Sequence, residues 1–281
     1  MLKTSKLALG TVQFGLNYGI SNKEGATDLK EVNKILQTAK ILGINTIDTA
    51  AAYGNSEMIL GQNDLSKFRV TTKFIDTSSH ENFVNQINSS FQKLRLEKIY
   101  AIMAHRPLVF IENHDYWKFL SDLKEQGKIN KIGASFNSVQ ELDRLLDKGI
   151  YLDIIQVPFN ILDQRFENYM KKLKGMGIEI HTRSTFLQGL FFCDINSLDD
   201  FFNPLKEYLC YLQSWKEELP QVLLSYVMNK SFIDKVVIGV NNSKQLLENV
   251  QNLDDNSKKI IPYNNELDEA LITPSMWPKI K

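Results

Sequence analysis

Short apolar runs rich in β-branched residues alternate with longer amphipathic segments along the whole chain of 281 residues. The short runs predict strands at 6–10, 46–50, 69–74, 98–105, 130–136, 152–159, 178–184 and 235–240. The longer segments predict eight main helices, at 28–42, 56–62, 81–94, 116–126, 138–147, 163–175, 217–229 and 243–251. Two further helices are expected at 198–212 and 265–271. Since the strands are apolar on both faces, the pattern favours a parallel sheet that is buried on both sides.

Eight strands that alternate with helices over this length indicate an α/β protein, a closed (β/α)8 TIM barrel with its active site on the C-terminal face. An open, doubly wound sheet is the alternative fold. It usually carries GxGxxG after its first strand, and the segment GTVQFGLNYG at 10–19 lacks that spacing. No Pro/Gly/Ser-rich tract, charge block or longer repeat marks a linker, so we expect one domain over residues 1–281.

Charge and cysteine usage narrow the class of partner. The 33 basic and 33 acidic residues cancel, which argues against nucleic acid, and no apolar run approaches the roughly 18 residues that span a bilayer. We therefore expect a cytoplasmic protein that acts on a small molecule, with an oligomeric state that the sequence leaves open. Cys193 and Cys210 form no disulfide framework. His80, His114 and His181 lack partners at metal-binding spacing, so no metal is predicted.

The ends of three consecutive strands carry residues suited to acid–base chemistry. Asp48 ends the second strand and Tyr53 follows in its loop, Lys73 ends the third, and His105 ends the fourth. An ammonium group near the phenol should lower the phenol's pKa, and Asp48 should keep that ammonium charged. His105 would then hydrogen-bond the reacting oxygen. Because Lys73 could also form a Schiff base, a lyase of the aldolase type stays open as an alternative.

Three motifs resemble the aldo-keto reductase family: DTAAAYG at 48–54, TTKF at 71–74 and AHRP at 104–107. The similarity continues through SEMILG at 56–61, IIQVPFN at 154–160 and VIGVNNSKQLLEN at 237–249. The resemblance implies NAD(P)H-dependent reduction of an aldehyde or ketone. Tyr53 would be the proton donor, with Asp48, Lys73 and His105 completing a catalytic tetrad. A catalytically idle, cofactor-binding regulatory module is a second alternative.

The same resemblance implies a set of cofactor contacts. Ser135 and Gln156 would hold the nicotinamide carboxamide, and the guanidinium of Arg183 would stack on the nicotinamide ring. Backbone N–H groups of Leu187, Gln188 and Gly189 would meet the pyrophosphate. The adenosine site would run from Gly239 to Asn249, with Ser243 and Gln245 near the phosphate and Glu248 and Asn249 near the adenine. Lys244 is the nearby cation after the last strand, so we expect NADP to bind about tenfold better than NAD.

The presumed substrate mouth mixes aromatic groups with hydrogen-bonding groups. The loops after the first and fourth strands bring together Asn17, Tyr18, Asn22, Lys23, Arg106 and Asn113. A site that hydrogen-bonds hydroxyl groups rejects analogues that leave its polar groups unpaired. The mouth therefore favours a sugar or nucleotide-linked sugar carbonyl over a lipid or steroid.

Overall fold

The structure of the protein, a computed structural model, describes residues 3–20, 22, 24–251, 253, 260–264 and 266–278. Lys23, expected at the substrate mouth, lies outside the described residues, as does the first residue of the helix expected at 265–271.

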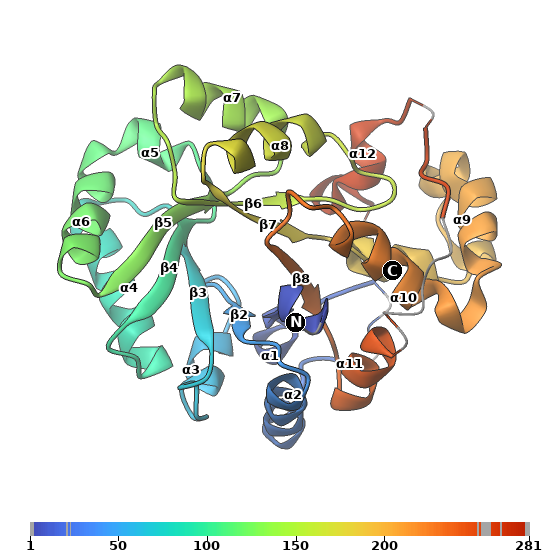
Figure 1. Ribbon diagram of the computed structural model, residues 1–281, viewed down its shortest axis with the longest axis horizontal. Coiled ribbons are helices and arrows are strands. Elements are labelled where there is room, and N and C mark those ends of the chain that lie inside the picture. Colours follow the sequence, from blue (N-terminus) through green and yellow to red (C-terminus); the bar gives the residue numbers. More distant parts are fainter. Residues whose placement is uncertain are drawn as a thin grey trace.

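Eight parallel strands close into a barrel in the order of the sequence (Figure 1). They are β1 Leu7–Gly10, β2 Thr46–Asp48, β3 Arg69–Phe74, β4 Ile99–Ala104, β5 Ile129–Ser135, β6 Ile154–Pro158, β7 Glu179–Arg183 and β8 Lys235–Gly239. β1 pairs with both β2 and β8, which closes the sheet and leaves no free edge. This confirms the predicted (β/α)8 barrel, and each strand lies within a predicted run except β5, which begins one residue before it.

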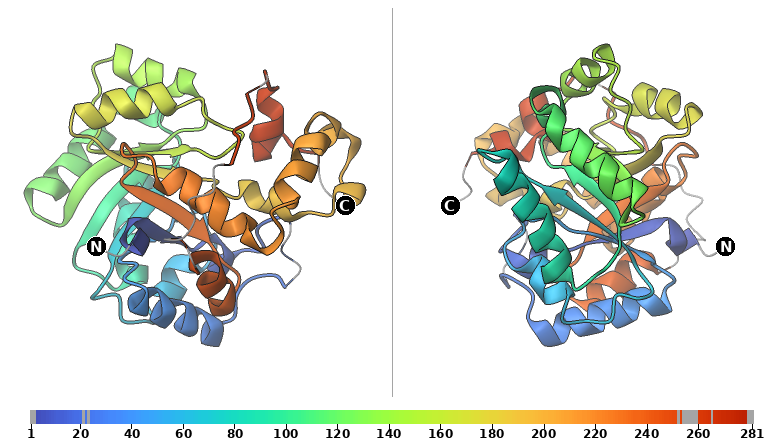
Figure 2. Two further views of the ribbon diagram at one scale, coloured as in Figure 1. Left: turned by 45° about the vertical axis from the view of Figure 1, so that its right-hand side comes forward. Right: turned by 90° about the vertical axis from the view of Figure 1, so that its left-hand side faces the viewer.

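Helices surround the barrel in every view (Figures 1 and 2). The α-helices are α1 Val12–Gly15, α2 Leu29–Ile41, α3 Ser56–Leu60, α4 His80–Leu94, α5 Val109–Glu112, α6 His114–Glu125, α7 Val139–Asp147, α8 Glu167–Gly175, α9 Lys206–Gln213, α10 Leu219–Met228, α11 Ser243–Val250 and α12 Glu269–Ile272. The 3-10 helices are η1 Lys3–Lys6, η2 Leu187–Phe192, η3 Ile195–Ser197, η4 Asp200–Leu205, η5 Lys216–Glu218 and η6 Pro274–Met276.

The differences from the predicted helices have local causes. α8 begins later than residue 163 because Asn160 Oδ1 accepts hydrogen bonds from the N–H groups of Leu162 and Asp163, which holds a turn there. α9 begins at Lys206 because the preceding segment, which contains Pro204, forms η4 instead. The four-residue helices α1 and α5 were not predicted, since a single turn leaves no periodicity to detect.

Two hydrophobic clusters position the C-terminal rim of the barrel. The larger one fills the space between the strands and the surrounding helices. The second cluster joins the segment after β7 to α9, α10 and α12, which lie together on one side of the molecule (Figure 2). The loop after β7 is therefore fixed against a core of its own. None of the helices within the described ranges has the length and apolar content needed to cross a membrane.

Candidate active site

The strand register places the predicted site residues on one rim. Gly10 at the end of β1 pairs with Asp48 on one side and with Gly239 on the other. Further round the barrel, Ser135 pairs with Gln156. Parallel strands end at the same side of a closed barrel, so residues distant in sequence converge on one mouth.

A buried ion pair lies at the base of this mouth. Lys73 Nζ donates a hydrogen bond to Asp48 Oδ2 at 2.6 Å and another to Thr49 O at 3.1 Å. Gln156 Nε2 donates to the second carboxylate oxygen of Asp48 at 2.7 Å. The Lys73 and Asp48 side chains are 1% and 4% exposed. Burial lowers the pKa of Lys73 and the Asp48 carboxylate opposes that shift, so the carboxylate supports the charged ammonium as predicted.

Tyr53 lies over this pair in a short turn after β2. Its ring centroid is 5.3 Å from Lys73 Nζ and 5.9 Å from the His105 ring centroid, and the two rings are nearly perpendicular. Gly54 holds the turn with φ of +55°, and a Cβ there would come within 2.6 Å of Gly15 O. Only glycine fits this approach, which explains the Tyr-Gly pair in the sequence.

The pKa of Tyr53 differs from the sequence prediction. Burial raises the pKa of the phenol above its ordinary value, the Asp48 carboxylate raises it further, and the Arg183 guanidinium opposes them. We predicted that Lys73 lowers this pKa. That prediction is wrong for the protein without bound cofactor or substrate, because Asp48, at 2.6 Å, balances the charge of Lys73. Tyr53 therefore keeps its proton at neutral pH.

His105 lies beside Tyr53 as a neutral imidazole. Burial lowers its pKa to about 4, and the Lys73 ammonium adds to that shift. Its buried Nδ1 atom has no hydrogen-bond partner within the part of the chain that the structure describes. Buried polar atoms are seldom left without a partner, so this nitrogen is a candidate for a functional role.

The low pKa of His105 predicts a dependence of stability on pH. Between its ordinary pKa of 6.5 and about 4, the unfolded chain binds a proton that the folded chain does not. The free energy of unfolding should therefore fall as the pH drops through this range, by up to roughly 3 kcal/mol from this group. Urea unfolding at pH 7 and pH ~4.5 should show a smaller loss in His105→Asn than in the parent. A His105 pKa near 6.5 by NMR titration would contradict this.

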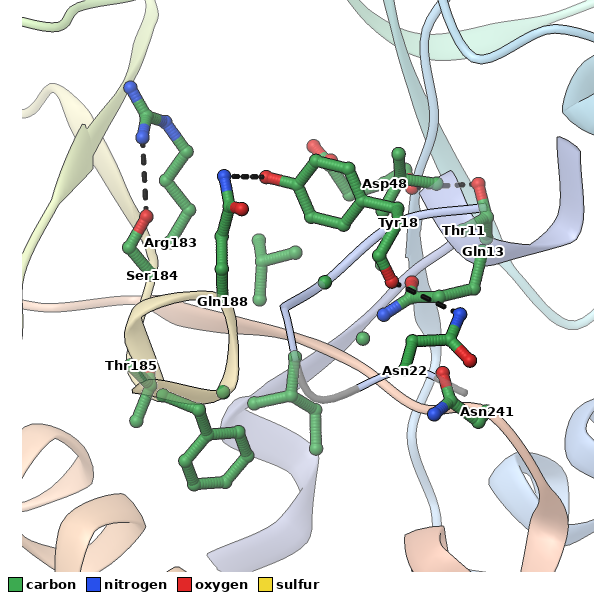
Figure 3. A pocket seen from close by; sticks show the side chains of 18 of the residues that line it. Thr11, Gln13, Tyr18, Asn22, Asp48, Arg183, Ser184, Thr185, Gln188 and Asn241 are labelled. Atoms are coloured by element: carbon green, nitrogen blue, oxygen red, sulfur yellow. Dashed lines mark hydrogen bonds between the residues drawn. The ribbon is translucent and has the colours of Figure 1, made fainter. Parts of the chain in front are cut away.

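An elongated cavity crosses the mouth from Tyr53 to the end of β8. Its wall comprises Gly10, Thr11, Val12, Gln13, Tyr18, Gly19, Asn22, Asp48, Tyr53, Gln156, Arg183, Ser184, Thr185, Phe186, Gln188, Gly189, Phe192, Val237, Ile238, Gly239, Asn241 and Gln245. Figure 3 shows Arg183, Ser184 and Gln188 on one side and Gln13, Tyr18 and Asn22 on the other. We name it the long cavity.

A second cavity joins the long cavity at Tyr53 and Arg183. Its wall comprises Tyr18, Tyr53, His105, Ser135, Asn137, Gln156, Pro158, Arg165, Arg183, Ser184, Gln188, Ile272, Thr273, Pro274 and Ser275. We name it the short cavity. Tyr53 belongs to both walls, so a group bound in either cavity can reach the phenol.

The long cavity fits an extended, polar cofactor that lies close to the protein backbone. Its wall includes four glycines, and a Cβ on Gly239 would come within 2.6 Å of the Gln13 side chain. Gln13 Oε1 is itself buried without a hydrogen-bond partner among the residues described. A wall with four glycines, where a ligand can approach the backbone closely, suits a nicotinamide dinucleotide.

The loop after β7 corrects part of the predicted pyrophosphate site. Leu187 is fully buried in the second cluster, and its N–H donates to Ser184 O at 2.9 Å. The N–H of Gly189 donates to Phe186 O at 2.8 Å. Two of the three predicted amides are thus already engaged. Gln188 and Gly189 do line the long cavity, and Gln188 Nε2 donates to the Tyr18 hydroxyl at 2.9 Å (Figure 3).

The predicted adenosine site at the end of β8 lies only partly on the wall of the long cavity. Gly239 and Gln245 line the long cavity, whereas Ser243, Lys244, Glu248 and Asn249 are absent from its wall. Lys244 pairs with Glu248 at 3.4 Å and is 84% exposed. Asn249 is buried.

Glu31, on the first turn of α2, binds the start of α11. Its Oε1 accepts hydrogen bonds from both the N–H and the hydroxyl of Ser243, each at 2.7 Å. These bonds, the N–H foremost, lower the pKa of Glu31 to about 2. This carboxylate was not predicted from the sequence, because an acidic residue in the first turn of a helix is ordinary.

Other wall residues were not predicted from the sequence, among them Gly10, Thr11 and Gln13 on the long cavity and Asn137 on the short one. The first three follow directly from the C-terminal end of β1, so the strand-end reasoning used for β2 to β4 would have found them. Of the residues expected at the substrate mouth, Tyr18 and Asn22 line the long cavity, while Asn17, Arg106 and Asn113 line neither.

Comparison with known proteins agrees with this geometry. The model of the Aldo/keto reductase family matches residues 6–261. The chain is 27% identical over 316 residues, covering 95% of both proteins, to an NADH-specific methylglyoxal reductase of Escherichia coli. It is 26% identical to a putative voltage-gated potassium channel subunit beta of Schizosaccharomyces pombe, covering 96% of this chain and 90% of that one.

Solved structures show the same fold. The holo form of an aldo-keto reductase from Bacillus halodurans superposes with a TM-score of 0.71 at 18% identity, covering 92% of this chain and 88% of that chain. A putative aldo-keto reductase from Pseudomonas aeruginosa superposes with a TM-score of 0.67 at 22% identity, covering 88% and 89%. Since the family model spans nearly the whole barrel, the chain belongs to the aldo/keto reductase family.

Proposed function

We propose that the protein reduces a small polar aldehyde or ketone, with Tyr53 as the proton donor. The observation that carries this is the buried Lys73–Asp48–Gln156 network beneath Tyr53, at the junction of the two cavities. A nicotinamide dinucleotide bound in the long cavity would supply hydride. Tyr53 keeps its proton at neutral pH and can give it to the oxygen that gains negative charge as the carbonyl is reduced.

The neighbouring groups support this transfer. His105, which is neutral at pH 7, can hydrogen-bond the carbonyl oxygen without competing as an acid. The charge of Arg183 favours the phenolate left on Tyr53 after it has lost its proton, and Lys73 limits the opposing effect of the Asp48 carboxylate. Ser135 and Gln156 are our proposed contacts to the nicotinamide carboxamide, because they end adjacent strands beside the phenol.

The lyase alternative is disfavoured by the position of Lys73. A Schiff base needs a neutral amine that the substrate can reach. Lys73 is 1% exposed, donates to Asp48 and lies beneath the Tyr53 ring. Borohydride trapping of a covalent adduct on Lys73 would be required to restore that alternative.

A cofactor titration followed by a carbonyl panel tests the proposed function. Fluorescence titration with NADH and NADPH measures binding. A panel of methylglyoxal, simple aldehydes, ketones and keto sugars then measures cofactor oxidation.

Relatives named for methylglyoxal and glyoxal reduction support small dicarbonyl compounds as substrates. The polar mouth supports keto sugars as substrates. A kcat/KM for apolar aldehydes that equals or exceeds that for every keto sugar would remove this support. Cofactor binding without any oxidation would favour the regulatory alternative, as a channel beta subunit among the relatives suggests.

We further propose that the protein prefers NAD(H) to NADP(H), in place of the preference expected from Lys244. The proposed adenosine end of the cofactor lies near Ser243, whose two donors are held by the Glu31 carboxylate. A 2′-phosphate there would be repelled by Glu31, whereas a 2′-hydroxyl could donate to it. Lys244 is exposed and lies near the Glu248 carboxylate, so its charge compensates only weakly.

Replacing Glu31 with glutamine tests the cofactor preference. We expect the parent to bind NADH on the order of tenfold more tightly than NADPH, which is about 1.4 kcal/mol. Glu31→Gln removes the charge but keeps an acceptor for Ser243, so the difference should largely disappear. Lys244→Ala is the matched control and should leave the ratio of Kd values unchanged. NADPH binding as tight as NADH binding in the parent would refute the proposal.

We retain two further predictions as proposals. The partner is a small-molecule carbonyl compound, and the protein works in the cytoplasm.

A further inference from the structure

Arg183 places a fixed positive charge where the two cavities meet. Its Nη2 donates to Phe136 O at 2.9 Å and to Asn137 Oδ1 at 2.5 Å, and its Nη1 donates to Ser184 Oγ at 3.2 Å. All three acceptors are neutral. They fix the plane of the guanidinium without balancing its charge, and other N–H donors of the group remain.

Arg183 differs in this respect from two other cations of the site, Arg165 and Lys73. Arg165, in the wall of the short cavity, pairs with Asp163 at 2.8 Å and with Glu269 at 2.7 Å. Lys73 pairs with Asp48 at 2.6 Å. Across the described ranges, Arg183 forms no ion pair with a carboxylate. It is the cation of the short cavity whose charge the protein leaves unbalanced.

The short cavity is suited to a negative ligand in other ways. No aspartate or glutamate is among the residues that form its described wall. The charge of Arg183 acts on the reacting groups, because it opposes the rise in the pKa of Tyr53 and contributes to the fall in that of His105. A partly buried cation without a counter-ion is costly, and an anion that enters the cavity removes that cost.

We propose that the substrate carries a carboxylate near its carbonyl group, and that Arg183 binds this carboxylate and determines substrate specificity. This inference rests on the proposed reductase function and names its substrate class. A carboxylate fits better than a phosphate because its single negative charge matches the one cation that the short cavity leaves unbalanced. A phosphate dianion would call for a second unbalanced cation, and Arg165 is already neutralised.

Substrate pairs matched in shape test the inference by turnover. The ortho, meta and para carboxybenzaldehydes are compared with the uncharged carbamoyl benzaldehydes. For the isomer that fits, kcat/KM should favour the carboxylate by on the order of ten- to a hundredfold, and the ratio should fall as salt is added. Arg183→Gln should bring the ratio close to one, and Arg183→Lys should keep part of it. The ratio cancels any loss that the variant causes for both substrates.

Arg106→Gln is the matched control, because Arg106 follows His105 but lies in neither cavity wall. Its ratio should equal that of the parent. The inference is wrong if Arg183→Gln lowers kcat/KM by the same factor for the charged and the uncharged member of each pair and also weakens cofactor binding. Arg183 would then act on the cofactor and not on the substrate carboxylate.

A binding measurement separates this inference from the proposed function. Quenching of protein fluorescence reports binding of benzoate and benzamide, which contain no reducible aldehyde. We expect benzoate to bind more tightly than benzamide to the parent, and Arg183→Gln to lose that difference. This result would stand even if no carbonyl were reduced. Equal binding of the two compounds to the parent, at low salt, would overturn the inference while leaving the reductase function untouched.

Discussion

Replacing Tyr53 with phenylalanine is expected to lower kcat for carbonyl reduction by about 10²- to 10⁴-fold, the usual contribution of a positioned general acid. The substitution removes one hydroxyl and keeps the ring that packs near Lys73 and His105. Cofactor affinity should change little, because Tyr53 is one of many residues in the wall of the long cavity and the substitution removes only its hydroxyl. Steady-state kinetics with one carbonyl substrate, together with a fluorescence titration of NADH, measure both quantities.

Tyr18→Phe provides the matched control for this experiment. Tyr18 also lines both cavities, and its hydroxyl accepts a hydrogen bond from Gln188. Losing one such bond should cost about 1 kcal/mol, or less than about tenfold in kcat/KM. A Tyr53→Phe enzyme that retains kcat within a few-fold of the parent would show that another group donates the proton. His105 would be the next candidate, although its low pKa makes it a poor acid at neutral pH.

The barrel and the catalytic group were predictable because both depend on regularities that repeat along the chain. The alternation of strands and helices fixes the fold class, and the ends of parallel strands share one rim. Asp48, Tyr53, Lys73 and His105 lie within one continuous stretch of that pattern, on β2 to β4 and their loops. Each could therefore be placed from its own strand.

Contacts between distant loops could not be predicted in the same way. Glu31 binds Ser243 across 212 positions, and Arg183 reaches back 47 positions to Phe136. Neither contact leaves a periodic signal, since each depends on the close approach of two loops. The pKa of Tyr53 was mispredicted for a related reason. The sequence shows which charges are near, but the sign of the shift depends on burial and on how fully Asp48 neutralises Lys73.

The segment after β7 shows why conformation limits such predictions. Ser184, Leu187 and Gln188 all have φ between 44° and 65°, an unusual region for residues other than glycine. This geometry turns the side chain of Leu187 into the second cluster and that of Gln188 toward the cavity. From the sequence alone the three consecutive residues 187–189 appeared equivalent as pyrophosphate contacts.

Breaking the buried ion pair should have the largest effect on stability. Asp48→Asn leaves the ammonium of Lys73 buried without a counter-ion, which typically costs about 3–5 kcal/mol of the free energy of unfolding. Lys73→Met leaves the Asp48 carboxylate with Gln156 as a partner, so we expect a smaller loss. Urea unfolding measures both. Lys40→Met, which breaks the exposed pair with Asp64 at 2.9 Å, is the control and should cost at most about 1 kcal/mol.

The double variant Asp48→Asn/Lys73→Met separates two sources of lost stability: the loss of the ion pair's attraction, and the cost of a buried charge left without a counter-ion. With both charges removed, no buried ion is left unpaired, so the double variant should be less destabilised than the sum of the single variants by about 0.5–3 kcal/mol. Catalysis should not recover with stability. Lys73→Met should lose the chemical step while keeping NADH affinity, because Lys73 lies against the Tyr53 ring and in neither cavity wall. The double variant should lose the chemical step as well, since it lacks the same ammonium. Additive losses of stability, or normal turnover by Lys73→Met, would contradict this account of the pair.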